Sequence, residues 1–312
     1  MGDLKAFRVD GGRVVEMVGS SVALERELQS LVEGNMEAML GVRFLASEYE
    51  TGRHRGRIDS LGLDETGAPV IVEYKRTRDK EVVTQALSYL AWLNDSRAEF
   101  EGLVRERLGA EAAGAVDWSR PRIVCVAGGF TPHTVVALEV IRQRIDLVAY
   151  QVFEDVVTLR LVASFTGPSS APAVPRSRAV PGAAVPVEEV PASGGGRTVQ
   201  QHLEAAPQEL KDLFADLDAV LTESGSVQRE ALQQYIAYRR IKNVASVKVQ
   251  PRKQALVVVL KVDPDTVELV DGFTRDLRGI GFHGTGCLEV RIRSRADLER
   301  AGGLIRRSVE AG

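Results

Sequence analysis

A proline- and glycine-rich segment in the middle of the chain prevents the whole sequence from folding as one unit. Residues 167–197 read GPSSAPAVPRSRAVPGAAVPVEEVPASGGGR and contain six of the twelve prolines. Such a composition cannot supply a packed core and is typical of an extended linker. We therefore predict a first domain over 1–165, a linker over 166–197 and a second domain over 198–312.

The composition is that of a soluble globular protein. Of the 312 residues, 44% are hydrophobic and 27% are charged, which argues against a disordered or membrane-embedded chain. No apolar run reaches the roughly 20 residues that cross a bilayer, and no secretory signal is visible, so we expect a cytoplasmic location and no membrane partner. Cys125 and Cys287 lie too far apart to indicate a disulfide framework or a zinc site.

The order of the expected elements gives the first domain an α/β fold. Apolar residues at helical spacing indicate helices within 20–40 and 81–94, and a short apolar run indicates a buried strand at 122–130. These segments, with the others expected here, form one mixed sheet flanked by helices. The other segments are strands over 42–50, 57–63, 69–75, 146–152 and 156–163 and a helix over 132–144.

The second domain is predicted to be a smaller α+β unit. The segments 198–223 and 228–241 have the pattern of helices, whereas VASVKVQ and ALVVVLKV, separated by PRKQ, are typical of a hairpin. A further strand is expected at CLEVRIRS, followed by a final helix. This order separates helices from strands and therefore favours an antiparallel sheet with helices packed on it.

Three ionisable side chains interrupt two apolar strands of the first domain. The sequence DETGA between the strands is a turn signal. If the strands fold back through this turn, Leu63 faces about Pro69 and Asp59 faces about Glu73, and directly opposite side chains lie close together. Lys75 is two residues after Glu73 and so points to the same face. Two carboxylates and one ammonium should therefore converge.

Convergent carboxylates of this kind suit Mg²⁺, which is typically held by one or two carboxylates and by phosphate oxygens of the substrate. A metal so placed can orient a water and offset charge on a phosphoryl group, the chemistry of phosphodiester hydrolysis. We predict Asp59, Glu73 and the backbone carbonyl of Tyr74 as ligands of Mg²⁺ or Mn²⁺. Lys75 would position the attacking water or stabilise the transition state. The alternative is a salt-bridge ladder on a solvated sheet face.

Two features favour the active-site interpretation. The helix that follows places Gln85 and Tyr89 on one face at i, i+4, beside the strands. Basic residues surround the carboxylates and could form a rim that binds phosphates: Arg53, Arg55, Arg57, Arg76 and Arg78.

A basic patch in the second domain is a further candidate nucleic-acid surface. The net charge of −3 argues against a globally basic nucleic-acid binder, so any such surface must be local. Between residues 231 and 262 there is no acidic side chain, and the candidate contacts are Arg239, Arg240, Lys242, Lys248, Arg252 and Lys253. A solvated helix followed by a hairpin would account equally well for these charges.

The spacing of Asp59 and Glu73-Tyr74-Lys75 resembles the PD-(D/E)XK nuclease superfamily, which has a restriction-endonuclease-like fold. More narrowly, GRIDSLG, VIVEYKR and the following Gln85 and Tyr89 resemble the catalytic domain of NucS/EndoMS-type endonucleases of archaea and actinobacteria. The resemblance covers roughly residues 20–125. It implies metal ligation by the two carboxylates, a catalytic Lys75 and supporting roles for Gln85 and Tyr89.

The same resemblance implies a glutamate on the first helix, for which Glu25 is preferred over Glu27. It also shows a departure, because NucS-type proteins carry their DNA-binding and dimerising domain before the nuclease domain, whereas here another domain follows. Mismatch specificity is therefore not implied. The C-terminal part resembles an uncharacterised domain appended to such nuclease-like domains in bacteria.

The sequence thus predicts a Mg²⁺-dependent DNA endonuclease or nickase, in DNA repair or phage defence, that acts as a homodimer. The alternative is a non-catalytic protein on a nuclease-like fold that binds nucleic acid or regulates a partner.

Overall fold

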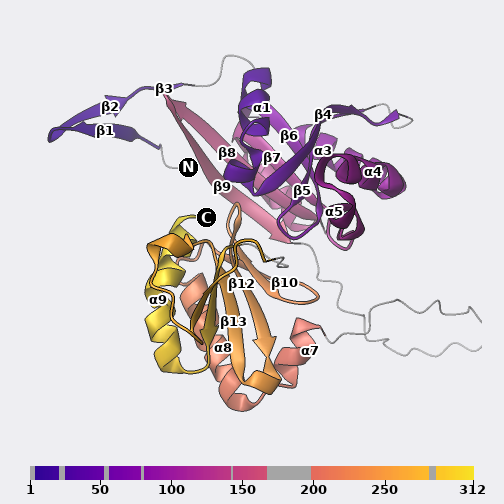
Figure 1. Ribbon diagram of the computed structural model, residues 1–312. Coiled ribbons are helices and arrows are strands. Elements are labelled where there is room, and N and C mark those ends of the chain that lie inside the picture. The colour runs from indigo at the N-terminus through magenta and orange to yellow at the C-terminus, as the bar shows by residue number, and fades with distance from the viewer. Residues whose placement is uncertain are drawn as a thin grey trace, which may run out of the picture.

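The computed structural model describes residues 4–20, 25–52, 56–78, 81–141, 143–166, 198–280 and 286–312. In the described residues, two large sheets, each with its own helices and its own hydrophobic core, form two domains, and a small two-stranded sheet projects from the first (Figure 1). The predicted linker, apart from its first residue, lies outside the described residues. No helix in the described part of the chain is long and apolar enough to cross a membrane.

The first sheet is mixed, as predicted. A central block of parallel strands is flanked by antiparallel neighbours, in the order β3-β8-β7-β6-β5-β4, with β9 paired to β8. The strands are β3 (Gly19–Ser20), β4 (Val42–Glu50), β5 (Arg57–Asp64), β6 (Pro69–Arg78), β7 (Arg122–Gly129), β8 (Arg144–Phe153) and β9 (Val156–Thr166).

Helices cover both faces of this sheet, which confirms the predicted fold class. On one face α1 (Glu25–Glu33) and α2 (Met36–Leu40) pack over Val72 and Val124, and on the other α3 (Glu81–Asp95) packs over Ile71. After Arg122, the central strand β7 is an unbroken apolar run from Ile123 to Ala127, because both of its faces are buried there. The remaining helices of this domain are α4 (Arg97–Leu108), α5 (Ala110–Gly114) and α6 (Pro132–Glu139).

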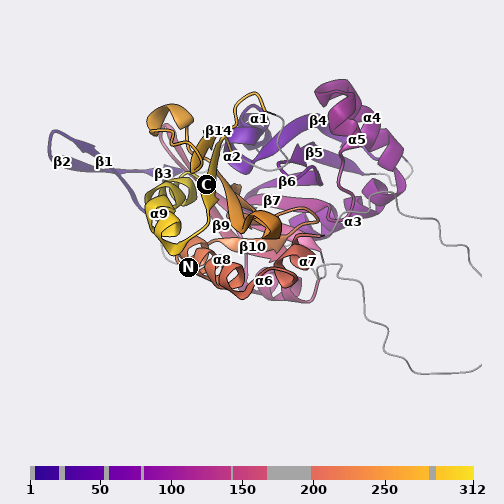
Figure 2. The same ribbon diagram turned by 60° about the horizontal axis from the view of Figure 1, so that its bottom comes forward.

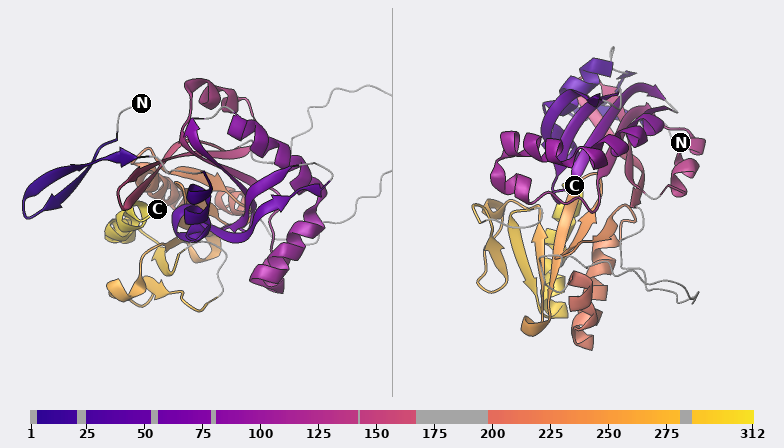
Figure 3. Two further views of the ribbon diagram at one scale, coloured as in Figure 1. Left: turned by 90° about the horizontal axis from the view of Figure 1, so that it is seen from above. Right: turned by 90° about the vertical axis from the view of Figure 1, so that its right-hand side faces the viewer.

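A two-stranded ribbon projects from the first domain (Figures 1 and 3). It consists of β1 (Ala6–Asp10) and β2 (Arg13–Met17), which pair antiparallel through a turn whose two glycines have positive φ. Arg8 ties the ribbon to the β8–β9 turn, because its guanidinium lies 2.9 Å from the Glu154 carboxylate and 3.2 Å from that of Asp155.

The second domain is an antiparallel six-stranded sheet with helices, which confirms the α+β prediction. Figure 2 shows α8 and α9 side by side against this sheet. The strand order is β10-β11-β12-β13-β15-β14. The strands are β10 (Gln228–Ala231), β11 (Ile236–Arg239), β12 (Asn243–Gln250), β13 (Ala255–Leu260), β14 (Thr274–Asp276) and β15 (Leu288–Ile292); the helices are α7 (Val199–Glu204), α8 (Gln208–Thr222) and α9 (Arg295–Glu310).

The prediction of a helix over 228–241 was wrong, because this segment forms the hairpin β10–β11. All four residues of β11 are buried, and Tyr238 donates a hydrogen bond to Asp218 of α8 at 2.6 Å. The polar start of the segment has helical propensity, but β12 offers a partner strand to the β-favouring residues that follow it. Tertiary pairing therefore overrides the local preference.

Buried ion pairs join the two domains. Asp146 of β8 is fully buried between two guanidinium groups, that of Arg122 at 2.7 Å and that of Arg239 from the second domain at 2.8 Å. The neighbouring Arg144 pairs with Asp64 at 2.8 Å and lies 3.3 Å from Glu230 of the second domain. The Arg239–Asp146 and Arg144–Glu230 pairs cross the interface, and they hold the domains in one arrangement because a buried charge that loses a partner is costly.

Further contacts extend the interface along the β5–β6 turn. The Glu65 carboxylate accepts hydrogen bonds from Lys261 and, at 2.8 Å, from the backbone of Asn243. Lys242 donates to the carbonyl of Ala38 at 2.9 Å. Arg122 is level with Val70 at the start of β6, so the second domain meets the sheet at the end where its parallel strands begin.

We expect Asp146→Ala to lower the free energy of unfolding of the full chain by about 3–5 kcal/mol, because it leaves two buried guanidinium groups without their carboxylate. Asp155→Ala is the matched control, since that carboxylate also pairs with an arginine but is 80% exposed; its cost should stay below about 1 kcal/mol. Urea unfolding followed by the fluorescence of Trp92 and Trp118 measures both. Equal losses for the two variants would contradict the role assigned to Asp146.

Candidate active site

The β5–β6 hairpin folds through the predicted turn. Leu63 pairs with Pro69, as expected, and the regular ladder runs back to Ser60 and Val72. The turn is closed by the Asp64 carboxylate, which accepts from the backbone of Thr66 and Ala68, and by Gly67 with a φ of 84°. A glycine fits here because this positive φ is strained for residues with a side chain.

At the next pair of positions after Ser60 and Val72, hydrogen bonds from backbone N–H groups to carboxylates take the place of the backbone ladder. These bonds bring Asp59 and Glu73 together. The backbone N–H of Asp59 donates to Oε1 of Glu73 at 3.2 Å. In return, the backbone N–H of Tyr74 donates to Oδ2 of Asp59 at 3.0 Å. The two carboxylates thus share one hydrogen-bonded unit at the far ends of their strands, away from the turn.

The Glu73 carboxylate is fully buried and only half satisfied. Its side chain has no exposed surface, and Oε2 is buried with no hydrogen-bond partner. Burial, followed by the negative charge of Asp59, raises the pKa of Glu73 to about 9. Burial also raises the pKa of Asp59, although the N–H of Tyr74 and the charge of Lys75 act against it. Such a site favours a proton or a cation.

Lys75 is held beside these carboxylates by Glu25. Its ammonium lies 3.0 Å from Oε1 of Glu25, and Oε2 of the same carboxylate accepts the backbone N–H of Arg76 at 3.1 Å. Partial burial disfavours the charge of Lys75, but the hydrogen bond and charge of Glu25 outweigh it and raise the pKa of the ammonium. The structure therefore places Glu25 at the site, whereas Glu27 is exposed on the same helix.

Gln85 and Tyr89 lie on α3 and hold the start of β5. Gln85 donates to the hydroxyl of Tyr89 at 3.2 Å, and that hydroxyl donates to the carbonyl of Arg57 at 2.8 Å. The contact requires a glycine at position 56, because a Cβ there would lie 2.4 Å from the ring of Tyr89. Both side chains thus act on the backbone two residues before Asp59 and do not touch the carboxylates.

The predicted phosphate-binding rim is only partly described. Arg57 and Arg76 are exposed near the carboxylates, and Arg57 lies 2.7 Å from the carboxylate of Glu48. Arg53 and Arg55 lie outside the described residues. Arg78 ends β6, but its side chain lies outside the description.

The prediction of a basic DNA-binding patch on the second domain needs correction. Arg239 is only 2% exposed and is paired with Asp146, so it cannot reach a DNA backbone. Lys242 contacts the first domain, and Arg240 donates to the carbonyl of Val309 at 3.4 Å. Lys248 is half-buried, and its burial lowers the pKa of the ammonium. The prediction was wrong for Arg239, because this residue lies on the buried strand β11 and not on a surface helix. Arg240, Lys242 and Lys248 are partly exposed, and their contact with nucleic acid stays a prediction.

Two residues of the expected patch remain exposed, Arg252 and Lys253. They lie in a short 3₁₀ turn between β12 and β13. Their contact with nucleic acid stays a prediction.

The sequence interpretation missed Gln29, which is 7% exposed and donates to the backbone carbonyl of Asp59 at 2.9 Å. The signal that could have found it is its position four residues after Glu25, on the same face of the first helix.

The donor set at Asp59 and Glu73 fits a hard divalent cation. Within the described ranges, no group of three or more His, Cys, Asp or Glu side chains is arranged to hold a metal. Mg²⁺, however, keeps several waters and is often bound through one or two carboxylates. The unpartnered Oε2 of Glu73, beside a second carboxylate, is an oxygen that such an ion would satisfy.

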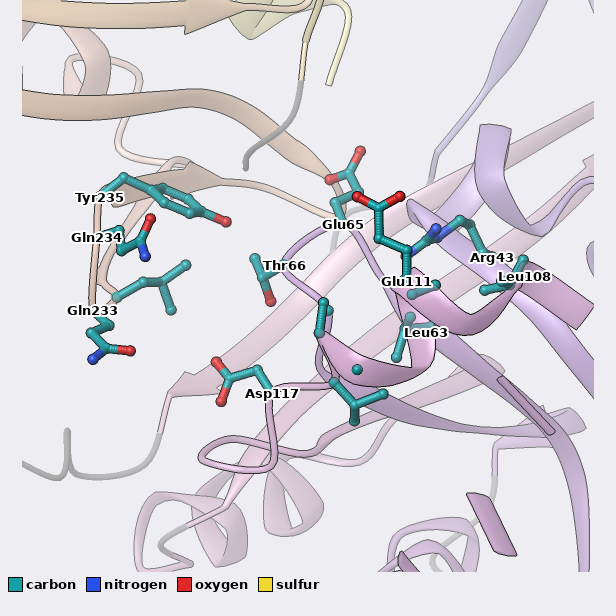
Figure 4. A pocket seen from close by; sticks show the side chains of 16 residues that line it. Arg43, Leu63, Glu65, Thr66, Leu108, Glu111, Asp117, Gln233, Gln234 and Tyr235 are labelled. Carbon is teal, nitrogen blue, oxygen red and sulfur yellow. The ribbon is translucent and has the colours of Figure 1, made fainter. Parts of the chain in front are cut away.

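A cavity of about 590 Å³ lies elsewhere, between the two domains (Figure 4). Its walls come from the β5–β6 turn, from α5 and from the loop that joins β10 and β11. The residues around it include Glu65, Glu111, Asp117 and Tyr235, and none of the predicted site residues. It lies at the end of the sheet opposite the paired carboxylates.

Comparison with known proteins gives a family match within the second domain. Residues 199–311 match the model of a domain of unknown function, DUF5655. An uncharacterized protein of Haemophilus influenzae is 25% identical over 98% of this chain and 100% of its own length. The similarity to that protein therefore extends over both domains and the segment between them.

Two solved endonuclease structures match part of the chain. One, described as an EndoMS–dsDNA complex, is 24% identical, with a TM-score of 0.27 over 42% of this chain and 47% of that one. A repair endonuclease from Pyrococcus abyssi is 21% identical, with a TM-score of 0.26 over 41% and 48%. The match spans about half the length of each solved chain. Because both TM-scores lie below 0.5, we interpret the site from its own geometry.

In EDTA, we expect Glu73→Gln to stabilise the chain, by about 1–3 kcal/mol at alkaline pH, because it relieves a buried and unsatisfied carboxylate. The raised pKa of Glu73 means that its contribution to stability is present below the unfolded pKa and is lost as the pH rises towards about 9. The gain should therefore grow between about pH 5 and about pH 9. Urea unfolding across this range measures it.

Asp64→Asn is the matched control, since Asp64 is another buried carboxylate of the same hairpin. Burial disfavours its charge, but Arg144 and Arg122 outweigh this and lower the pKa of Asp64. That variant should destabilise the chain throughout the same range. A Glu73→Gln variant that behaves like Asp64→Asn would contradict the description of the site.

Proposed function

We propose that this protein is a metal-dependent DNA endonuclease or nickase of the PD-(D/E)XK type, which hydrolyses phosphodiester bonds. The observation that carries the proposal is the buried, unpartnered Oε2 of Glu73 beside Asp59, with an ammonium two residues further along the same strand. A structural salt-bridge ladder would pair these carboxylates with cations. Here the only cation of the trio, Lys75, bonds to Glu25 instead.

Asp59 and Glu73 would hold the metal, with the backbone carbonyl of Tyr74 as a further candidate ligand. Mg²⁺ is the proposed ion, and Mn²⁺ the substitute. When bound, such an ion lowers the pKa of a coordinated water and offsets the negative charge of a phosphoryl group. Binding would also favour the ionised form of Glu73, because a cation nearby opposes the effect of burial.

The residues around the carboxylates have separate tasks in this proposal. Lys75 would stabilise a phosphate oxygen or position an attacking water with its positive charge. Glu25 holds the Lys75 ammonium in place. Gln85 and Tyr89 hold the backbone at Arg57 and so fix the direction in which β5 presents Asp59. Positioning of this kind matters because small displacements of reacting groups cost much of the rate.

DNA would approach the end of the sheet where β6 finishes, with Arg57 and Arg76 exposed nearby to bind phosphates. The second domain is docked at the other end, so its contribution to substrate choice would come from its outer surface, including Arg252 and Lys253. A role in DNA repair or phage defence and a homodimeric state are parts of the proposal that follow from the family resemblance.

We expect cleavage of labelled DNA in the presence of Mg²⁺ or Mn²⁺ and none in EDTA. The panel contains single-stranded, duplex, mismatched and branched substrates. Glu73→Gln should abolish the cleavage, and Lys75→Met should lower kcat by about 100- to 1,000-fold, the range for loss of one charge-stabilising group. Glu139→Gln and Lys211→Met, which change charged helix residues away from the site, should cleave like the unaltered chain.

Binding of DNA by the unaltered chain without cleavage of any substrate would favour the alternative, a non-catalytic nucleic-acid-binding protein on a nuclease-like fold. Cleavage that persists in both Glu73→Gln and Lys75→Met would show that the active site lies at other residues.

We also expect millimolar Mg²⁺ to raise the melting temperature of the unaltered chain and to have little effect on Glu73→Gln. A ligand that binds only the folded state stabilises it according to its concentration relative to Kd, by about 2.7 kcal/mol at 100 times Kd. Calorimetric scans with Mg²⁺, Ca²⁺ and EDTA measure this. An equal response of Glu139→Gln and Glu73→Gln would indicate that the ion binds outside the proposed site.

A further inference from the structure

The helix α1 carries a polar stripe that faces the candidate active site. Glu25, Gln29 and Glu33 recur every four residues and so share one side of the helix, beside Leu28 and Val32, which are fully buried in the core. Each member of the stripe bonds to a different part of the β5–β6 pair. The first, Glu25, is the partner of Lys75 described above.

Gln29 is the central member of the stripe, and the two N–H groups of its amide face three oxygen acceptors, so that one hydrogen is shared between two of them. Its Nε2 lies 2.9 Å from the backbone oxygen of Asp59, 3.0 Å from Oε1 of Glu33 and 3.2 Å from the hydroxyl of Ser47 on β4. The side chain is 7% exposed, so water does not replace these bonds easily. It therefore links the helix to β5, the strand that carries Asp59, and to the neighbouring strand β4.

Glu33 closes the stripe from the other end. Its Oε1 accepts a second hydrogen bond, from the hydroxyl of Ser60 at 2.6 Å, and that hydroxyl lies 3.2 Å from the hydroxyl of Tyr74. Ser60 and Tyr74 follow Asp59 and Glu73 in sequence and are both fully buried. The network thus runs behind the two carboxylates, on the face of the sheet that α1 covers.

Asp59 is consequently held at three points. Gln29 binds its carbonyl oxygen, Glu73 accepts its backbone N–H, and the backbone of Tyr74 donates to its carboxylate. Of these partners, Gln29 alone is outside the hairpin. The Glu33–Ser60 bond also joins this helix to β5, but of the two bonds only that of Gln29 is made to Asp59 itself.

We propose that Gln29 is a positioning residue of the active site. It fixes the backbone of Asp59 relative to α1, and so sets where the Asp59 and Glu73 carboxylates stand with respect to the Glu25–Lys75 pair. This inference rests on the proposed nuclease function for its catalytic consequence, but the fixing of Asp59 is a property of the fold alone. Partners that orient a metal-binding carboxylate typically change metal affinity or activity by about 10- to 100-fold when removed.

The test compares Gln29→Met, which keeps the length of the side chain but has no N–H, with Ser30→Ala, which changes the exposed neighbour on the same helix. Gln29→Glu is the second variant, in case the first does not fold, because it keeps the shape and polarity and lacks the donor when ionised. Three measurements are made on the full chain: Mn²⁺ affinity by calorimetry, kcat and KM for DNA, and exchange of the backbone amides of Asp59 and Tyr74.

For folded Gln29→Met or Gln29→Glu we expect Mn²⁺ affinity and kcat to fall by about 10-fold or more, the range for groups that orient metal ligands. KM for DNA should stay nearly constant. The amides of Asp59 and Tyr74 should lose protection, while amides nearer the turn of the same hairpin keep theirs. Ser30→Ala should match the unaltered chain in every measurement.

Unchanged amide protection and unchanged Mn²⁺ affinity in a folded variant would overturn the role of Gln29. A different result would overturn the proposed function instead: an unaltered chain that neither binds Mn²⁺ nor cleaves DNA. In that event the exchange measurement still decides whether Gln29 fixes Asp59, so the two failures are distinguishable.

Discussion

A carboxylate that is buried away from water must be paired with a positive charge or be protonated. This molecule satisfies the constraint in opposite ways at the two ends of one sheet. Where the parallel strands begin, Asp64 and Asp146 are buried against arginines. Where β6 ends, Glu73 is equally buried, and among the described residues no cation forms an ion pair with it. The first arrangement joins two domains, and the second leaves an oxygen free for a ligand.

The same constraint explains how the charges of the second domain are used. A run of basic side chains without acidic neighbours resembles a nucleic-acid surface in the sequence, but several of these cations find their counter-charges or carbonyls within the molecule. Arg239 and Lys261 bond to carboxylates of the first domain, and Lys242 bonds to a helix carbonyl. Some of the charges that indicate a DNA-binding module in the sequence therefore bind the second domain to the first.

The sequence was sufficient for the features set by local chemistry. The DETGA turn determines the register of β5 and β6, because a two-fold side-chain period leaves one pairing that buries the apolar face. It also places Asp59 and Glu73 together without any knowledge of the tertiary fold. Gln85 and Tyr89 followed from helical spacing, although their contact with the carbonyl of Arg57 did not.

What the sequence could not provide depends on partners far away along the chain. The segment 228–241 has helical propensity and forms a hairpin only because its second strand pairs with β12. Arg239 is exposed in any local interpretation and is buried only because Asp146 lies 93 residues earlier in the chain and close in space. Helical spacing could have placed Gln29 on the face of Glu25, but it could not have shown its acceptor, because a backbone carbonyl leaves no signature in the residue type.

The docking of the domains has a consequence for how such a chain is assembled. The ion pairs that fix their orientation come from Arg144, Asp146, Glu230 and Arg239, all outside the predicted linker. The connection then contributes a high effective concentration of one domain near the other, while side-chain complementarity supplies the geometry. The side chains at the interface, and not the peptide connection, therefore determine how the two domains lie relative to each other.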